Sequence, residues 1–544
     1  MLALPTRVLD IGASESGIVY LREQDVAPRV APYAALSHCW GLSQPFTTIT
    51  ANFQLRKDGI RIAELPQSFR DAITMTKALG IQYLWIDSLC IIQDDIGDWQ
   101  RESASMMMVY RGAHVVIGAS SASADSEGFL HRRSTDTGSF SQAKFTLRLL
   151  PPEPQRLSPT SDPVKDEPLS TRAWCLQERY IPHRVLLVSK GQMYWECFNM
   201  LASEDGDCIA QNGGRLRQIK ETAGIDLSIT GISGRGLDEI NKANYFHWYE
   251  TVKAYAKRDV TKESDRLPAL AGLAFVVSPD HKDYMAGIWK KGLIEGLLWC
   301  RADQERPLST PAEYRAPSWS WASVEGPINF PVYNFYDRCK WKWVMANFEP
   351  LATYIHSLLE PSGEDFFGGV KDGYLTLRGP LLPLLSITHF SKISYTPSDF
   401  IMEPFRSTAC DQVLETELKH NGKTETIYLD GGFDTEERRE AQGKLFIFLL
   451  ARLPDTQSAS GVYMDIRFGL ILEALAPGRY KRVGIIDGVV KTHKPTLRSR
   501  LTHKVHLENY LWKQHELKGE DEVSPNLQGP DPFAGLEQTI VTII

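Results

Sequence analysis

The chain has 544 residues, a length that predicts roughly three to four folded units at about 100–200 residues each. Hydrophobic residues make up 43% of the chain and charged residues 23%, as in ordinary globular proteins. The formal net charge of −7 argues against a protein that coats nucleic acid or an anionic membrane, because both need a concentrated basic face.

The first residues lack the apolar core of a secretory signal. The most continuous apolar run, Leu445–Leu450, is far shorter than the roughly 20 residues that a membrane-spanning helix needs. The eight cysteines occur singly, without a CxxC pair, so no local zinc or dithiol motif is present. We therefore expect a cytoplasmic protein without a membrane span, a metal site or a resident cofactor.

Residues 33–118 predict alternating strands and helices. Apolar runs at 33–39, 83–92 and 113–118 are typical of strands that are covered on both faces. Between them, apolar side chains at helical spacing predict one helix after Pro66 and another that is capped by Asp98. This order of elements predicts a parallel sheet with right-handed crossovers.

The pattern changes after the third strand. Six prolines within 149–170 predict an exposed insertion that buries nothing. A short helix is predicted over 171–180 and a hairpin over 185–197, after which helical patterns give way to short strands and turns. The predicted domains are an α/β domain over 1–205 that contains the proline-rich insertion, a mainly helical region over 206–326 and a β-rich C-terminal domain over 327–544.

Polar side chains follow the predicted parallel strands where a ligand site is expected. In open α/β sheets ligands bind at the carboxyl ends of the strands, which is where Ser37, His38 and Asp87 fall. His38 and Cys39 are adjacent on a strand and therefore point to opposite faces, so they do not form a catalytic dyad. Asp87 serves either such a site or the loop that it begins, by accepting backbone N–H bonds.

Trp174 and Glu178 lie four residues apart in a predicted helix and therefore share a face. An aromatic plane over a carboxylate suits a ligand with a flat ring and a developing positive charge. Taken alone, the residues favour a plainer alternative, in which Trp174 packs in the core and Glu178 pairs with Arg172 or Arg179.

Several blocks of sequence, in this order, resemble the fungal heterokaryon-incompatibility (HET) domain over residues 33–180. The blocks are 33–41, 79–95, Asp98–Trp99, Met107–Tyr110 and 172–178. Two later segments resemble the usual companions of that domain: 264–274 and 314–323. The resemblance implies a role in triggering programmed cell death when genetically unlike fungal cells fuse.

The resemblance also implies a fold. The HET domain is considered similar to Toll/interleukin receptor (TIR) domains, so the expected N-terminal domain is a flavodoxin/TIR-like parallel sheet with flanking helices. Some TIR domains cleave NAD, and plant-type members carry a Trp-Cys-Leu-x-Glu string whose glutamate is catalytic. Residues 174–178 match that string, but the glycine-rich loop of many TIR domains has no clear counterpart in this chain.

The first functional hypothesis is a cell-death effector that hydrolyses the ribosyl–nicotinamide bond of NAD. Glu178 is the candidate catalytic residue, because a carboxylate stabilises the oxocarbenium character that develops at the anomeric carbon. An indole would stack on a flat ring of the substrate. The predicted substrate-binding residues are Ser37, His38, Trp40, Asp87 and Trp174.

Two other hypotheses remain open. The chain is either a non-enzymatic signalling module, which self-assembles through the HET sheet and recruits protein partners through its β-rich region, or an enzyme of fungal specialised metabolism that uses the same cleft. The expected partners are thus NAD or a related nucleotide, other proteins or further copies of this chain, and no nucleic acid.

Overall fold

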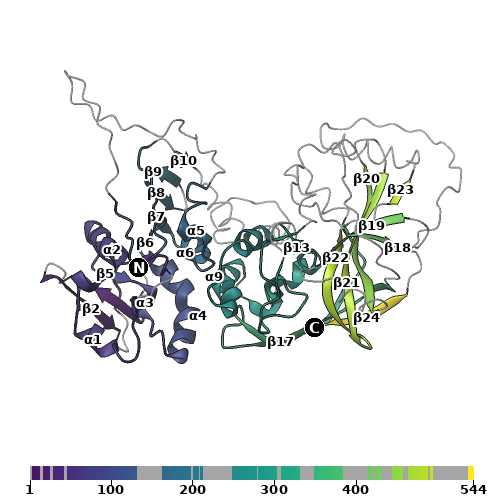
Figure 1. Ribbon diagram of the computed structural model, residues 1–544, viewed down its shortest axis with the longest axis horizontal. Coiled ribbons are helices and arrows are strands. Elements are labelled where there is room, and N and C mark those ends of the chain that lie inside the picture. The colour runs from purple at the N-terminus through teal and green to yellow at the C-terminus, as the bar shows by residue number, and fades with distance from the viewer. Residues whose placement is uncertain are drawn as a thin grey trace, which may run out of the picture. The chain divides into compact units, whose positions relative to one another are not determined.

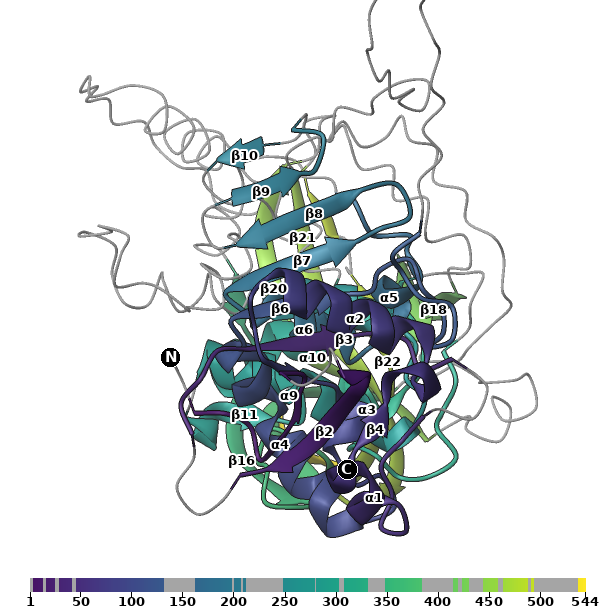
Figure 2. The ribbon, with the colours of Figure 1, turned by 90° about the vertical axis from the view of Figure 1, so that its left-hand side faces the viewer.

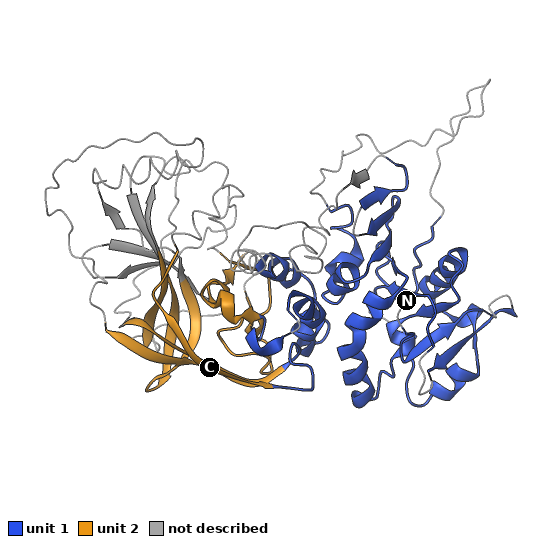
Figure 3. Cartoon of the chain, turned by 180° about the vertical axis from the view of Figure 1, so that it is seen from behind, with its two compact units in different colours: residues 1–287, 361–369 blue, residues 288–360, 370–544 orange. Residues whose placement is uncertain are grey.

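The computed structural model divides the chain into two compact units, which Figure 3 shows in different colours: Met1–Gly287 with Pro361–Gly369, and Ile288–Glu360 with Val370–Ile544. The boundary at Gly287 falls inside the stretch predicted as the helical region. The structure describes residues 3–12, 16–24, 29–41, 46–131, 162–197, 200–206, 209–211, 248–278, 280–302, 308–330, 348–383, 414–418, 423–429, 444–457, 463–487, 491–493 and 537–544.

The first unit contains a ten-stranded sheet in the described part of the chain, with the strand order β10-β9-β8-β7-β6-β3-β5-β1-β2-β4. Figure 2 shows the strands from β6 to β10 side by side. The strands are β1 (Arg7–Asp10), β2 (Ile18–Glu23), β3 (Tyr33–Ser37), β4 (Ile60–Arg61), β5 (Tyr83–Trp85), β6 (Val115–Gly118), β7 (Arg184–Val188), β8 (Met193–Cys197), β9 (Met200–Ser203) and β10 (Ile209–Gln211).

Four neighbouring strands, β5, β3, β6 and β7, run parallel at the centre of this sheet. Ala34 of β3 pairs with Leu84 of β5 on one side and with Val115 of β6 on the other. β7 continues the parallel series and also forms the predicted hairpin with β8. The expected α/β class with a parallel sheet is therefore confirmed.

The strand predicted over 83–92 is wrong beyond Trp85, because residues from Asp87 onward form a helix. The amide of Cys90 donates to the carbonyl of Ile86 at 2.8 Å, which is a helical bond. Leu89 is fully buried in that helix, as it would be in a strand. A short apolar run does not distinguish the two structures.

Helices cover both faces of the parallel strands: Figure 1 shows α2 on one side and α4 with α6 on the other. Phe69 of α2 packs edge-on against His38, and the hydroxyl of Tyr33 donates to the carbonyl of Val109 in α4. The helices of this unit are α1 (Phe53–Asp58), α2 (Gln67–Ala78), α3 (Asp87–Cys90), α4 (Ile96–Gly112), α5 (Pro168–Thr171), α6 (Cys175–Tyr180) and α9 (Pro268–Val277), with 3₁₀ turns at Ile62–Glu64, Glu263–Arg266 and His281–Asp283.

The helix predicted to be capped by Asp98 begins earlier, so that prediction is wrong in its cap. Asp95 is the N-cap of α4, and its carboxylate accepts a hydrogen bond from the amide of Asp98 at 3.0 Å. Asp98 instead lies inside the first turn, where it is buried and pairs with Arg7 of β1. This carboxylate therefore joins α4 to the sheet.

The proline-rich segment 149–170 falls partly outside the described residues, which resume at Asp162. For its final nine residues, the prediction that nothing is buried is wrong. Val164 is 1% exposed and Leu169 is 5% exposed. Asp162 accepts two hydrogen bonds from Arg179 of α6. Residues 162–170 are thus held by two apolar side chains and one ion pair, which proline density alone does not reveal.

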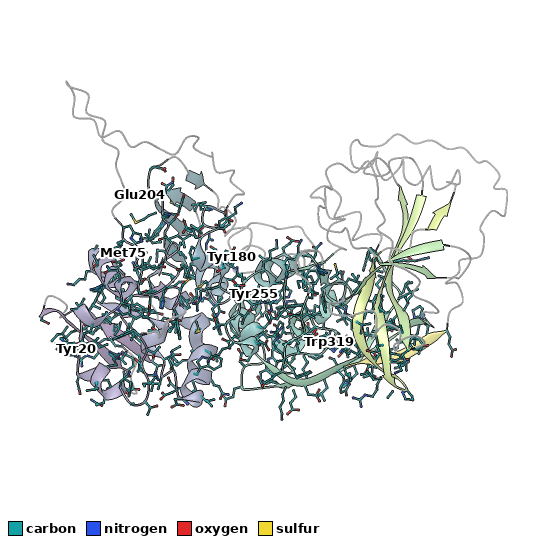
Figure 4. The ribbon with its side chains drawn as sticks, viewed as in Figure 1. Tyr20, Met75, Tyr180, Glu204, Tyr255 and Trp319 are labelled. Atoms are coloured by element: carbon teal, nitrogen blue, oxygen red, sulfur yellow. The ribbon has the colours of Figure 1, made fainter. Side chains whose placement is uncertain are left out.

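Helical residues after the sheet complete the first unit. Tyr255, labelled in Figure 4, is fully buried in a helix at 248–256. α9 approaches α6 and α4 so closely that a Cβ at Gly272 would lie 2.7 Å from Gln177 Oε1 and 2.9 Å from Met107 Cβ. Phe367, from the separate segment Pro361–Gly369, packs against the ring of Phe275.

The second unit is rich in strands, as predicted for the C-terminal region. Strand pairings connect β17, β20, β21, β22 and β24 in a closed circuit, because β24 pairs with both β22 and β17. Leu377, Phe448, Leu470 and Val541 are fully buried there.

The first unit also contains β11 (Tyr284–Met285). The strands that follow it are β12 (Ile288–Trp289), β13 (Cys300–Arg301), β14 (Ile328–Asn329), β15 (Glu349–Pro350), β16 (Thr353–Pro361), β17 (Val370–Pro383), β18 (Leu414–Leu418), β19 (Lys423–Leu429), β20 (Leu445–Gln457), β21 (Tyr463–Ala476), β22 (Arg479–Asp487), β23 (Lys491–His493) and β24 (Gln538–Ile543). Helix α10 (Leu293–Leu297) and 3₁₀ turns at Lys290–Gly292 and Trp321–Ser323 lie between these strands. None of the described helices is long and apolar enough to cross a membrane.

Candidate functional site

The candidate site lies where the connections of the parallel sheet change direction. β3 and β6 are neighbours, but the chain leaves β3 for β5 on one side and leaves β6 for β7 on the other. Such a switch point opens a crevice at the carboxyl ends of the two strands. Ser37 ends β3 and Gly118 ends β6, and these two residues are register partners. The topology therefore places Ser37 at the point where a ligand is expected.

Glu178 reaches this point from α6. Its side chain accepts a hydrogen bond from the hydroxyl of Ser37 at 2.5 Å, and the residue is 4% exposed. Ser37, Ser120 and Glu178 help to line a small cavity that has room for about one water molecule. The carboxylate of Glu178 is thus buried against the end of the central strand.

The environment of Glu178 raises the pKa of its carboxyl group to about 7. Burial is the main cause, and the negative charge of Asp87 adds to it. The hydroxyl of Ser37 and the guanidinium of Arg172 act in the opposite direction, since both favour the charged form. Glu178 is therefore a carboxyl group that changes its charge near neutral pH.

The carboxylate of Asp87 begins a loop, as one of its two predicted roles requires, and it also contacts two other predicted site residues. One carboxylate oxygen accepts a hydrogen bond from the amide of Ser88 at 2.7 Å, which fixes the start of α3. The other accepts a hydrogen bond from the indole N–H of Trp40 at 2.9 Å. Nδ1 of His38 lies 3.7 Å from the first oxygen. Asp87 thus holds both the loop and two of the predicted binding residues.

His38 and Ser37 point to opposite faces of β3, as adjacent residues of a strand must. His38 is buried on the α2 face, against Phe69, whereas Ser37 faces Glu178 of α6. Burial lowers the pKa of His38, which keeps its ring neutral. The structure therefore brings His38 to Asp87, but places it on the other side of the strand from Ser37 and its hydrogen bond to Glu178.

Trp174 has a different partner from the one that its spacing suggested. Its indole N–H donates to the carboxylate of Asp265 at 3.0 Å, and the ring packs against the core of the first unit. Trp174 is not among the residues that line the cavity beside Glu178. The bond to Asp265 attaches the start of α6 to the 3₁₀ turn that precedes α9.

The ion pair considered between Glu178 and Arg179 does not form. The guanidinium of Arg179 binds Asp162 and Glu196 instead, and it is held between those two carboxylates. Sequence reasoning also missed Arg258, which lines the cavity, and Tyr110, whose pKa is raised by burial and by the charge of Glu178. No local pattern marks these residues, because each comes from a different helix or turn.

Several buried polar atoms near the strand ends have no hydrogen-bond partner among the described residues. They are both ring nitrogens of His38 and the hydroxyls of Ser88, Ser120 and Ser121. Buried polar groups are normally bonded, so these atoms leave hydrogen-bonding capacity for water or a polar ligand at this edge of the sheet. Within the described ranges, no group of His, Cys, Asp and Glu side chains is arranged to hold a metal ion.

Comparison with known families identifies the part of the chain that carries this geometry. Residues 33–178 match the family model described as Heterokaryon incompatibility protein (HET). The match begins at the first residue of β3 and ends at Glu178 itself. No curated protein and no solved structure matches the chain.

Proposed function

We propose that this protein is a cell-death effector that hydrolyses NAD. The match of residues 33–178 to the HET family model supports a role of the heterokaryon-incompatibility type. The single observation that supports the proposal most is the buried carboxyl group of Glu178. It lies at the switch point of a parallel sheet, and its pKa is raised to about 7. Strongly shifted carboxyl groups in such positions are typical of catalytic sites.

The proposed reaction breaks the bond between the anomeric carbon of ribose and the nicotinamide nitrogen. The electron pair of that bond leaves with nicotinamide, which departs as a neutral molecule. Water then adds to the anomeric carbon and releases one proton, and the products are nicotinamide and ADP-ribose. Since the leaving group is neutral, the reaction needs no strong general acid.

Glu178 supplies the negative charge that stabilises the transition state. The ribose ring gains positive charge as the bond breaks, and an ionised carboxylate in a water-poor site stabilises that charge. The hydroxyl of Ser37 holds the carboxylate in one orientation. Because only the ionised form acts in this way, activity rises with pH through about 7.

The size of the cavity sets a condition on substrate entry. It has room for about one water molecule, so the ribose reaches Glu178 only when neighbouring side chains move. Asp87 and Trp40, which are joined by a hydrogen bond, are only half-buried and are therefore the solvent-accessible members of the predicted site. The substrate therefore approaches from that side, where the indole of Trp40 is available to stack on a flat ring.

The test is release of nicotinamide from NAD by the purified full-length protein. We expect Glu178→Gln to lower the rate by about 10²–10³, because it keeps the shape of the side chain and removes its charge. Glu64→Gln, at an exposed residue paired with Arg61, is the matched control and leaves the rate unchanged. Melting temperature checks that both variants fold.

Two results would overturn the proposal. Equal turnover by the Glu178→Gln variant and the wild type would remove this carboxylate from the mechanism. A wild-type protein that releases no nicotinamide, both as a monomer and in any assembled state, would favour a signalling module or an enzyme with another substrate.

A further inference from the structure

Ser120 lies two residues beyond the end of β6, and hydrogen bonds fix its backbone there. Its amide donates to the carbonyl of Gly118 at 2.9 Å, and its carbonyl accepts a hydrogen bond from the amide of Leu169 in α5 at 3.3 Å. Gly118 is the register partner of Ser37, so this turn begins level with the end of β3. Ser120 is 1% exposed. The chain therefore holds a buried hydroxyl group close to the strand ends.

The hydroxyl of Ser120 has no hydrogen-bond partner among the described residues. Buried hydroxyls are normally bonded to the protein or to ordered water. Ser120 also lines the cavity beside Glu178, which has room for about one water molecule. Ser88 and Ser121 carry similar unpartnered hydroxyls, but neither residue lines this cavity. Of these three serines, only Ser120 is therefore placed to share a water molecule with Glu178.

The cavity offers the polar partners that a buried water needs. Such a water makes about two to four hydrogen bonds. The hydroxyl of Ser120 is able to donate one, and the carboxylate of Glu178 is able to accept one. The oxygen of Ser37, whose proton goes to Glu178, is able to accept another. Val116 and Leu187 form apolar parts of the wall, which favour one bound water over bulk solvent.

We propose that this cavity holds one water molecule, which Ser120 binds and which donates a hydrogen bond to the carboxylate of Glu178. Ser120 is then a positioning residue, because it acts on the carboxylate through the water. A hydrogen bond donated to a carboxylate stabilises its charged form, so the water keeps Glu178 more ionised than burial alone allows. The inference rests on the proposed function only for its effect on NAD cleavage.

Other groups also influence the charge of Glu178, and a change at Ser120 leaves them in place. The charged and titratable groups that interact with Glu178 or line its cavity are Asp87 of α3, Tyr110 of α4, Arg172 before α6, Cys175 and Arg179 of α6, and Arg258. The hydroxyl of Ser120 bonds to none of them. An altered ionisation of Glu178 in a Ser120 variant is therefore due to the water.

The first experiment follows the ionisation of Glu178 and needs no substrate. In full-length protein labelled with ¹³C at the glutamate carboxyl groups, NMR follows the Glu178 signal, which is identified by its absence from Glu178→Gln. We expect Ser120→Ala to raise the pKa of Glu178 from about 7 to about 8, as loss of one hydrogen bond to a charged group predicts. Ser121→Ala, which removes an unpartnered hydroxyl outside the cavity, is the matched control and leaves this pKa unchanged. An unchanged pKa in Ser120→Ala would overturn the proposal.

The second measurement uses the wild type alone, so it holds even if Ser120→Ala fails to fold. A high-resolution crystal structure is expected to show density for one water within hydrogen-bonding distance of Oγ of Ser120 and of the carboxylate of Glu178. A cavity without such density would contradict the assignment.

The rate of NAD cleavage separates this proposal from the proposed function. At pH 7 we expect Ser120→Ala to be about fivefold slower than the wild type, because fewer of its Glu178 side chains are ionised, and at pH 9 the two rates are equal. Equal slowing at both pH values would show that Ser120 supports the shape of the site and would refute the positioning role. If NAD is not cleaved but the titration and the density are as expected, the proposed function fails and the water site stands.

Discussion

Asp98 and Glu178 of the first unit carry carboxyl groups that are almost equally hidden from solvent, but these two groups have different partners. Asp98 is 2% exposed and Glu178 is 4% exposed. Asp98 accepts a hydrogen bond from the guanidinium of Arg7 at 2.9 Å and another from the amide of Ile92. For Glu178 no cation lies within ion-pairing distance among the described residues, and the hydroxyl of Ser37 is its close partner. Burial alone therefore does not separate a structural carboxylate from a candidate catalytic one, and the lack of a paired cation is what makes Glu178 the candidate.

If Arg7 and Asp98 form a structural pair, breaking it has the largest effect on stability. We expect Arg7→Ala to lower the free energy of unfolding by about 3–5 kcal/mol, because the buried carboxylate of Asp98 then keeps only the exposed Arg101 as a cation. Urea unfolding measures the loss. Arg61→Ala, at an exposed pair with Glu64, serves as the control and costs less than about 1 kcal/mol. Similar small losses in both variants would contradict the structural role.

Glu178 is expected to make the stability of the protein depend on pH, because its carboxyl group holds a proton more tightly in the folded state than in the unfolded chain. The pKa is about 7 when folded and 4.5 in the reference state, so wild-type stability falls as pH rises from about 4.5 to 7. The fall amounts to about 3 kcal/mol. Glu178→Gln lacks an ionisable group here and shows none of this fall.

The measurement is the free energy of unfolding at several values of pH between 4 and 8. In Asp87→Asn, which removes a charge that raises the pKa of Glu178, the fall is smaller and ends at a lower pH. Identical pH profiles for the wild type and Glu178→Gln would mean that this carboxyl group has an ordinary pKa and does not differ from an exposed one.

A smaller effect is expected where α9 contacts the helices that carry both carboxylates. In Gly272→Ala the new Cβ lies 2.9 Å from the Cβ of Met107 in α4, which is fixed to its backbone, so a helix must shift. Overpacking costs about 1–3 kcal/mol, and the better helix propensity of alanine offsets about 1 kcal/mol. Gly191→Ala, with no atom within 4 Å of the new Cβ, is the control. A melting temperature of Gly272→Ala no lower than that of the control would show that α9 is free to adjust.

The sequence predicted the central sheet because its strands are covered on both faces and therefore carry continuous apolar runs. It did not predict that residues after Trp85 form α3, since a buried helix and a buried strand need the same apolar side chains. The start of α4 was misplaced for a related reason. Asp95 and Asp98 are both able to cap a helix, and only the ion pair of Asp98 with Arg7, distant in sequence, separates them.

For the candidate site, the strand-end rule correctly placed Ser37 and Asp87 near the carboxyl edge of the sheet. The partner of Trp174 was not predictable, because Asp265 lies 91 residues away and no local spacing relates them. The charge state of Glu178 likewise depends on Asp87 and on burial, which are properties of the folded chain. The roles of these residues in binding a substrate stay predictions until the reactions above are measured.

The segment Pro361–Gly369 has a practical consequence for any dissection of this protein. Since that segment belongs to the first unit, the polypeptide passes between the two units three times, and one cleavage cannot separate them. A fragment that ends at Gly287 would lack Phe367 and leave the rings of Phe275 and Tyr284 uncovered. Such a truncation would aggregate or melt early for reasons unrelated to function. A functional assay of a shortened chain is therefore informative only when the fragment retains Pro361–Gly369.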